Sequence, residues 1–311
     1  MGINTSVKIG KITLKNPVIA ASGTFGSGKE YSDFIDINKL GAIITKTITL
    51  KPRQGNPPPR LCETPAGLLN SIGLQNEGVN NFIKEKLPQL ARLKTSIIVS
   101  VAADRPDEIF EVVKRLNNTN TAAIELNLSC PNVKTGKSVG LKPDTLIAQH
   151  APWTKIFVSV ARKATDKTLI TKLSPNVTDI TEIAMAAKEG GADAVSLVNT
   201  FFGMAADIDT KRPKLGNVTG GLSGPAIKPI ALKMVWDLFN KVKIPIIGIG
   251  GIMDYKDALE FIICGATAVQ VGTANFINPD ATINIIKGIE EFLKKDKINN
   301  IKDLIGALKT Q

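Results

Sequence analysis

The sequence predicts an α/β fold in which eight parallel strands and their helices close into a (β/α)8 TIM barrel. Eight short apolar runs recur along the chain, with amphipathic stretches between several of them. Continuous apolar runs of this length are typical of parallel strands buried on both faces. An open doubly wound sheet is the weaker alternative, because no G-x-G-x-x-G follows the first run. The expected strands are residues 18–21, 42–45, 97–101, 122–126, 168–171, 194–198, 246–249 and 268–271.

Helices are expected where apolar residues recur at helical spacing between these strands. Residues 106–116 and 179–189 each carry one apolar stripe, and a glycine pair follows the second. Residues 255–263 form a third helix that Gly265 closes. Residues 145–164 are also expected to be helical, with a break or restart at Pro152.

Two further segments have their own place in this fold. Residues 5–14 alternate apolar and polar across Gly10 and Lys11, which predicts a small hairpin at the bottom of the barrel. Residues 51–81 are too long for a simple connection, and such insertions after barrel strands tend to build the active site. With no internal repeat or linker in sight, residues 1–311 are interpreted as a single domain.

Composition excludes several classes of function. The three cysteines have no C-x-x-C spacing, so we expect neither a disulfide framework nor an iron–sulfur cluster in this chain. The single histidine, His150, nearly excludes a Ser–His–Asp triad or a histidine-rich metal site, and it is expected at the surface. No nucleic-acid recognition motif accompanies the net charge of +11. No apolar run is long enough for a signal peptide or membrane span, which indicates a cytoplasmic protein. No metal site is expected either.

The segment that begins at Asn127 is the most informative for chemistry. It follows the fourth strand and places Asn127, Cys130 and Asn132 at the start of a loop. Asparagine side chains both donate and accept hydrogen bonds, which suits a planar cyclic amide or imide. A thiol beside such a ligand can act as a base if its pKa allows. The plain alternative for Cys130, a small buried hydrophobe, is disfavoured by the two carboxamides.

Other strand ends complete a candidate site, because chemistry in this fold lies at the carboxyl ends of the strands. Lys46 and Lys172 follow buried strands and would place cations in the barrel mouth, where they can stabilise an anion. The glycines after the seventh and eighth strands would expose backbone N–H groups as a phosphate cradle. The combination predicts a flavin mononucleotide (FMN) enzyme that acts on a small acidic amide.

Nine motifs occur in order between about residue 15 and residue 279: ASGTFG from Ala21, TKT from Thr45, ETPAGLLNSIGLQNEG from Glu63, NLSCPNVK from Asn127, KLSPN from Lys172, VNTFFGMAADIDT from Val198, GGLSGPAIKP from Gly220, IPIIGIGGI from Ile244 and VGTANF from Val271. They resemble the motifs of the class 1 dihydroorotate dehydrogenases. In having cysteine at position 130, the sequence resembles class 1, because class 2 enzymes have serine there. The Asn132-Val133-Lys134 sequence is most similar to type 1B.

This resemblance implies oxidation of (S)-dihydroorotate to orotate in pyrimidine biosynthesis, with Cys130 as the base and FMN as the hydride acceptor. The family pattern assigns substrate contacts to Lys46, Asn70, Ser71, Ile72, Gly73, Leu74, Asn127, Asn199 and Thr200. It assigns FMN contacts to Ser22, Lys46, Thr47, Ser100, Asn127, Lys172, Val198, Gly224, Gly250, Gly251, Gly272 and Thr273. Ser100 stands where the family commonly has asparagine, and its shorter side chain would lose a direct flavin contact or reach through water.

Type 1B further implies a partner subunit with flavin adenine dinucleotide (FAD) and an iron–sulfur cluster that passes electrons to NAD. The chain would then pair as a homodimer within a heterotetramer. Two alternatives stay open: a fumarate-dependent type 1A enzyme, and another FMN barrel such as a dihydrouridine synthase. The second would act on tRNA, but the RNA-binding domain it should carry is absent from this sequence.

Overall fold

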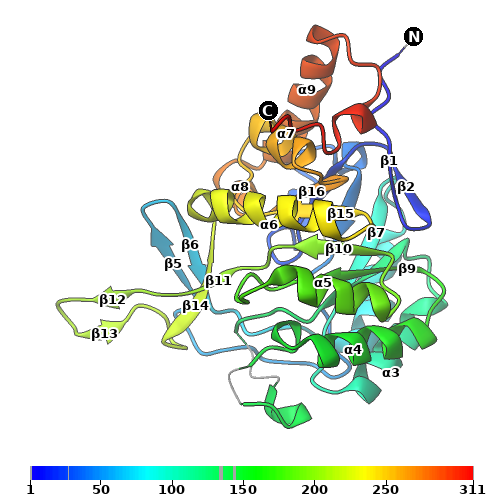
Figure 1. Ribbon diagram of the computed structural model, residues 1–311. Coiled ribbons are helices and arrows are strands. Elements are labelled where there is room, and N and C mark those ends of the chain that lie inside the picture. The colour runs from blue at the N-terminus through cyan, green and yellow to red at the C-terminus, as the bar shows by residue number, and fades with distance from the viewer. Residues whose placement is uncertain (1, 27, 133–135, 143–144, 311) are drawn as a thin grey trace.

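The computed structural model describes residues 2–26, 28–132, 136–142 and 145–310. Eight parallel strands form a closed barrel in the order β10-β15-β16-β3-β4-β7-β8-β9 (Figure 1). Each lies within or overlaps one of the eight predicted runs, so the predicted fold class is confirmed. The barrel strands are β3 (Val18–Ala20), β4 (Ala42–Ile44), β7 (Ser96–Val101), β8 (Ala123–Asn127), β9 (Thr168–Lys172), β10 (Ala194–Leu197), β15 (Ile246–Ile249) and β16 (Ala268–Val271).

Helices cover the outside of the barrel. The four predicted helices are present, and two long ones, α6 and α9, were not in the predicted set. The long helices are α3 (Pro106–Asn117), α4 (Ala151–Lys163), α5 (Ile180–Glu189), α6 (Lys228–Lys241), α7 (Tyr255–Ile263) and α9 (Ala281–Lys295). Shorter ones are α1 (Gly78–Asn81), a π-helical turn (Phe82–Lys86), α2 (Leu87–Leu90) and α8 (Ala274–Ile277). None of the helices within the described ranges has the length and apolar character of a membrane span.

The predicted restart at Pro152 is confirmed. A 3-10 turn at Ile147–Gln149 precedes α4, and Pro152 lies in the first turn of that helix, where its missing N–H costs no hydrogen bond. His150 is the N-cap, and its Nδ1 accepts a hydrogen bond from the Trp153 backbone N–H at 3.4 Å. The expected surface histidine is therefore a half-buried helix cap.

The N-terminal hairpin is confirmed at the bottom of the barrel. It pairs β1 (Val7–Ile9) with β2 (Ile12–Leu14). The Lys11 backbone N–H donates to Thr168 Oγ1 at 2.9 Å, and Thr168 begins β9. Gly10 has φ of +55°, and a Cβ there would lie 2.8 Å from the Thr168 side chain. The turn needs glycine for its conformation and for its close approach to the barrel.

A second sheet lies at the other end of the barrel and projects to one side of it (Figure 1). It has four antiparallel strands in the order β11-β14-β6-β5: β11 (Phe201–Met204), β14 (Thr219–Ser223), β6 (Gly67–Asn70) and β5 (Leu61–Thr64). The insertion at residues 51–81 thus pairs with a later insertion, through Gly221 opposite Asn70. A short two-stranded arm, β12 (Ala206–Asp207) and β13 (Arg212–Pro213), extends from the later insertion.

Helix α7 offers a test of how local caps stabilise this fold. The Asp254 side chain accepts hydrogen bonds from the Lys256 and Asp257 backbone N–H groups at 2.8 and 3.1 Å. We expect Asp254→Ala to lower the free energy of unfolding by about 1 kcal/mol, the usual cost of a lost N-cap. Urea denaturation of the purified protein would measure this.

Asp280→Ala is the matched control for this cap. Asp280 is the exposed N-cap of α9 and makes no side-chain capping bond. Both variants remove a negative charge near a helix N-terminus, so their difference isolates the capping bonds. Equal destabilisation by the two substitutions would contradict the capping role.

Candidate active site

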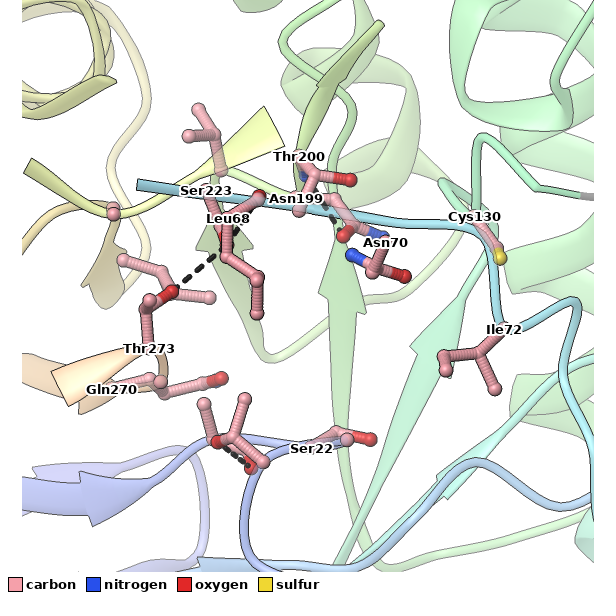
Figure 2. Close-up of a pocket in the computed structure, with 18 of the residues that line it drawn as sticks. Ser22, Leu68, Asn70, Ile72, Cys130, Asn199, Thr200, Ser223, Gln270 and Thr273 are labelled. Atoms are coloured by element: carbon pink, nitrogen blue, oxygen red, sulfur yellow. Dashed lines mark hydrogen bonds between the residues drawn. The ribbon is translucent and has the colours of Figure 1, made fainter. Parts of the chain in front are cut away.

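A cavity of about 330 Å³ opens at the carboxyl ends of the barrel strands, beside the four-stranded sheet (Figure 2). Most of the predicted site residues line it, although they come from all parts of the chain. They are Ser22, Lys46, Thr47, Asn70, Ile72, Gly73, Leu74, Asn127, Cys130, Lys172, Val198, Asn199, Thr200, Gly224, Gly250, Gly251, Gly272 and Thr273.

Two predicted site residues do not reach the cavity wall. Ser71 is fully buried, and its hydroxyl has no hydrogen-bond partner among the described residues. Ser100 is also fully buried, with its Oγ 2.9 Å from Thr47 Oγ1. A direct contact between Ser100 and a ligand is therefore not supported by the geometry. Instead Ser100 fixes the hydroxyl of Thr47, which does line the cavity.

Hydrogen bonds hold the carboxamide of Asn127 in one orientation. Its Nδ2 donates to Thr47 Oγ1 at 3.0 Å, and its Oδ1 accepts from Ser129 Oγ at 3.2 Å. Asn199 Nδ2 in turn donates to Ser129 Oγ at 3.0 Å. This network joins the ends of β4, β8 and β10. Such preorganised donors and acceptors suit recognition of a planar amide.

A second pair of carboxamides connects the loop after β8 to the antiparallel sheet. Asn132 Nδ2 donates to Asn70 Oδ1 at 3.0 Å, and Asn70 Nδ2 donates to the Gly221 carbonyl at 3.3 Å. Asn132 lines the cavity but was absent from the predicted contact set, although it lies in the same motif as Cys130. Val133 and Lys134, on which the type 1B resemblance partly rests, lie outside the described residues.

Cys130 faces the cavity beside Ile72 and Asn70 (Figure 2). Burial raises the pKa of its thiol to about 11, against the opposing effects of the Asn132 backbone N–H, Lys172 and Arg53. Only about one thiol in ten thousand is then ionised at pH 7. Since the thiolate is the form that accepts a proton, a reaction that uses Cys130 as base must become faster as the pH rises.

Two lysines bring positive charge to the cavity. Lys172 is only 6% exposed and has no hydrogen-bond or ion-pair partner in the described part of the chain. Because this side chain lines the cavity, its unpaired ammonium group favours a ligand with anionic or oxygen acceptors there. Lys46 lies at the exposed rim of the cavity. Partial burial lowers its pKa, and the positive charges of Lys86 and Arg60 lower it further.

Gly251 follows β15 and Gly272 follows β16, and the two positions differ in whether packing requires glycine. Gly251 has φ of +71°, and a Cβ there would lie 2.8 Å from the Gly224 carbonyl oxygen, so the fold itself requires glycine. At Gly272 the nearest atoms to an added Cβ are 3.7 Å away, so packing does not demand glycine. Because Gly272 has no side chain, the cavity is wider at this position. Beside it, Thr273 Oγ1 donates to Ser223 Oγ at 2.8 Å.

These features fit FMN. The glycines supply a cradle with room for a phosphate, Lys172 supplies an unpaired cation, and Gln270 supplies a buried carbonyl oxygen without a partner in the described residues. Gln270 and Ser223 line the cavity and were not predicted. The signal for Gln270 was a lone polar residue inside the apolar run of β16; Ser223 gave none that we can identify.

The comparisons agree with this geometry. The family model described as dihydroorotate dehydrogenase matches residues 4–293. A protein of Trichlorobacter lovleyi named dihydroorotate dehydrogenase B (NAD(+)), catalytic subunit, is 54% identical over 305 residues, which cover 97% of this chain and 98% of the relative. A protein of the same name from a Thermoanaerobacter species is 50% identical over 308 residues and 99% of both chains.

A solved structure is also similar. The crystal structure of DHODH in complex with ferulenol from Eimeria tenella matches with a TM-score of 0.79 and 25% identity. The match covers 98% of this chain and 88% of that one. Since the family model and the close relatives span almost the whole sequence, the chain is an oxidoreductase that belongs to the dihydroorotate dehydrogenase family.

Proposed function

We propose that this chain is the catalytic subunit of an NAD-linked dihydroorotate dehydrogenase, which oxidises (S)-dihydroorotate to orotate in pyrimidine biosynthesis with FMN as its cofactor. The observation that carries this proposal is the meeting of Cys130, the asparagine network and the glycine cradle in one cavity of a family member. The relatives' names support the NAD-linked subtype. The family match favours this reading over a dihydrouridine synthase. Residues 1–311 act as one FMN-binding domain.

Dihydroorotate is a small cyclic imide with a carboxylate, and the cavity offers a partner for each part. The carboxamides pair with the imide N–H and C=O groups, because each carboxamide both donates and accepts. Lys46 at the rim attracts the carboxylate. The proposed substrate contacts are Lys46, Asn70, Ser71, Ile72, Gly73, Leu74, Asn127, Asn199 and Thr200, with Asn132 added; Ser71, buried behind the wall, would contribute only through its backbone.

FMN is held by the residues around the cradle and, when bound, supplies the acceptor for a hydride from C6 of the substrate. Cys130 as thiolate takes the proton from C5, and the electron pair of that C–H bond becomes the second bond between C5 and C6. Lys172 stabilises negative charge in the cavity. The proposed FMN contacts are Ser22, Lys46, Thr47, Asn127, Lys172, Val198, Gly224, Gly250, Gly251, Gly272 and Thr273, with Ser100 acting through Thr47.

The phosphate cradle can be tested without disturbing the fold. We expect Gly272→Leu to purify with at least tenfold less FMN, because the new side chain enters the cavity while its Cβ fits among its neighbours. The flavin absorbance per protein would measure this. Gly2→Leu is the control, since a Cβ at Gly2 meets nothing within 4 Å. A full flavin complement in Gly272→Leu would refute the cradle.

The base can be tested by substitution and by pH. We expect Cys130→Ala to slow flavin reduction by dihydroorotate about a hundredfold, the scale of a lost general base. In the unchanged protein the rate should rise about tenfold per pH unit between about pH 7 and pH 10, because a raised pKa leaves the thiol protonated below that value. Stopped-flow absorbance measures both.

Cys130→Ser should keep slight activity that is shifted to still higher pH, because a hydroxyl is a weaker acid than a thiol. Cys62→Ala and Cys264→Ala are the controls and should react normally, since neither cysteine lines the cavity. Near-normal turnover in Cys130→Ala at neutral pH, or a rate that falls as the pH rises from 7 to 10, would exclude Cys130 as the base.

The route by which electrons leave is also open to test. We propose that a partner subunit with FAD and an iron–sulfur cluster carries them to NAD, and that this chain forms a homodimer within a heterotetramer. The isolated chain should then reduce artificial dyes with dihydroorotate but not NAD. Rapid NAD reduction by the isolated chain would contradict the partner, and brisk fumarate reduction would assign the chain to type 1A.

A further inference from the structure

A buried carboxylate lies in the barrel interior below the cavity, and the chemistry above does not use it. Glu125 of β8 is fully buried, two residues before the cavity-lining Asn127 and on the same face of the strand. Its Oε2 accepts hydrogen bonds from Ser196 Oγ and Gln270 Nε2, each at 2.8 Å. These two bonds tie the side chains of Ser196 and Gln270 to Glu125, whose other oxygen, Oε1, is buried without a partner among the described residues.

The bond to Gln270 crosses the barrel. Between β8 and β16 lie β3, β4 and β7 on one side and β9, β10 and β15 on the other, so the two strands face each other. Gln270 donates through Nε2, so its NH2 group faces Glu125. The carbonyl oxygen Oε1 is thereby fixed away from Glu125. It is buried and has no partner among the residues that the structure describes.

The place of Gln270 indicates what that oxygen would bind. Gln270 lines the cavity, and its side chain extends into it (Figure 2). Gly272 and Thr273 of the proposed phosphate cradle follow on the same strand, whereas Asn127 and Cys130 belong to the opposite strand and its loop. In FMN the ribityl chain, which carries hydroxyl groups, joins the phosphate to the ring. The ribityl chain is therefore the part of FMN that must pass Gln270.

We propose that Gln270 accepts a hydrogen bond from a ribityl hydroxyl of FMN, and that Glu125 is the positioning residue that turns Gln270 to do so. This inference rests on the proposed function, since it requires FMN in this cavity. It adds two residues, from opposite sides of the barrel, to the cofactor site.

The test compares two ligands on the flavin-free protein. One is FMN, and the other is an FMN analogue whose side chain is a plain pentyl phosphate without hydroxyls. We expect Gln270→Leu to bind FMN about tenfold more weakly, as for one lost buried hydrogen bond, and the analogue as tightly as the unchanged protein does. Quenching of flavin fluorescence measures both affinities. Unchanged FMN affinity, or equal loss of both ligands in Gln270→Leu and in the milder Gln270→Met, would overturn the proposal.

A double-mutant cycle tests the role of Glu125. Glu125→Leu should weaken FMN binding by a similar factor, and adding Gln270→Leu should weaken it no further, because Glu125 acts only through Gln270. Ser196→Ala is the control: it removes a bond to the same carboxylate oxygen, but Ser196 does not line the cavity. Its FMN affinity should stay within about twofold. Additive losses, or a Ser196→Ala loss as large as that of Gln270→Leu, would overturn the positioning role.

Failure here is separable from failure of the proposed function. An unchanged protein that binds FMN and oxidises dihydroorotate keeps its proposed function whatever these variants do. An unchanged protein that binds no FMN would overturn both.

Discussion

Because the barrel closes through β16 against β3 and through β9 against β10, the carboxyl ends of all eight strands meet at one mouth. Residues far apart in the sequence, such as Ser22, Asn127, Lys172 and Thr273, thereby line one cavity. Each follows or ends a short strand, so its backbone is held by neighbours on both sides. The site depends on this closure more than on any single contact within it.

The site also depends on the pairing of β6 with β14, which joins two insertions at the mouth of the barrel. This pairing sets Asn70 opposite Gly221, and Asn70 then accepts a hydrogen bond from Asn132 in the loop after β8. Glycine is required at position 221 for a different contact, since a Cβ there would overlap the Thr200 side chain. The proposed substrate side of the cavity is thus built from two insertions and one loop, whereas the proposed cofactor side is built from the barrel itself.

The barrel could be predicted because parallel strands buried on both faces leave uninterrupted apolar runs in the sequence. The four-stranded sheet could not, because its strands are short and partly exposed, and β6 pairs with a strand from a distant insertion. The site residues were likewise predictable only where the sequence around them carried a local pattern. Residues directly after barrel strands were found, whereas Ser223 and Gln270 were missed. Asn132 was singled out in its motif but was left out of the predicted contacts. Ser100 holds a place in the family's flavin-contact pattern, where its shorter side chain was expected to lose a direct contact or reach through water; in the structure it bonds to Thr47 behind the wall.

Two polar groups of this cavity suit a bound ligand. Within the described residues, the Lys172 side chain has no counter-charge, and Gln270 Oε1 is buried without a donor. A buried acceptor without a partner costs free energy, since buried polar groups are stable only when paired. A ligand with an acceptor near Lys172 and a donor near Gln270 supplies both partners at once. Binding of such a ligand also stabilises the fold, because it binds the native state alone. Burial of Cys130 acts differently: it raises the pKa of the thiol, so the free energy of ionising that thiol must be supplied during the reaction itself.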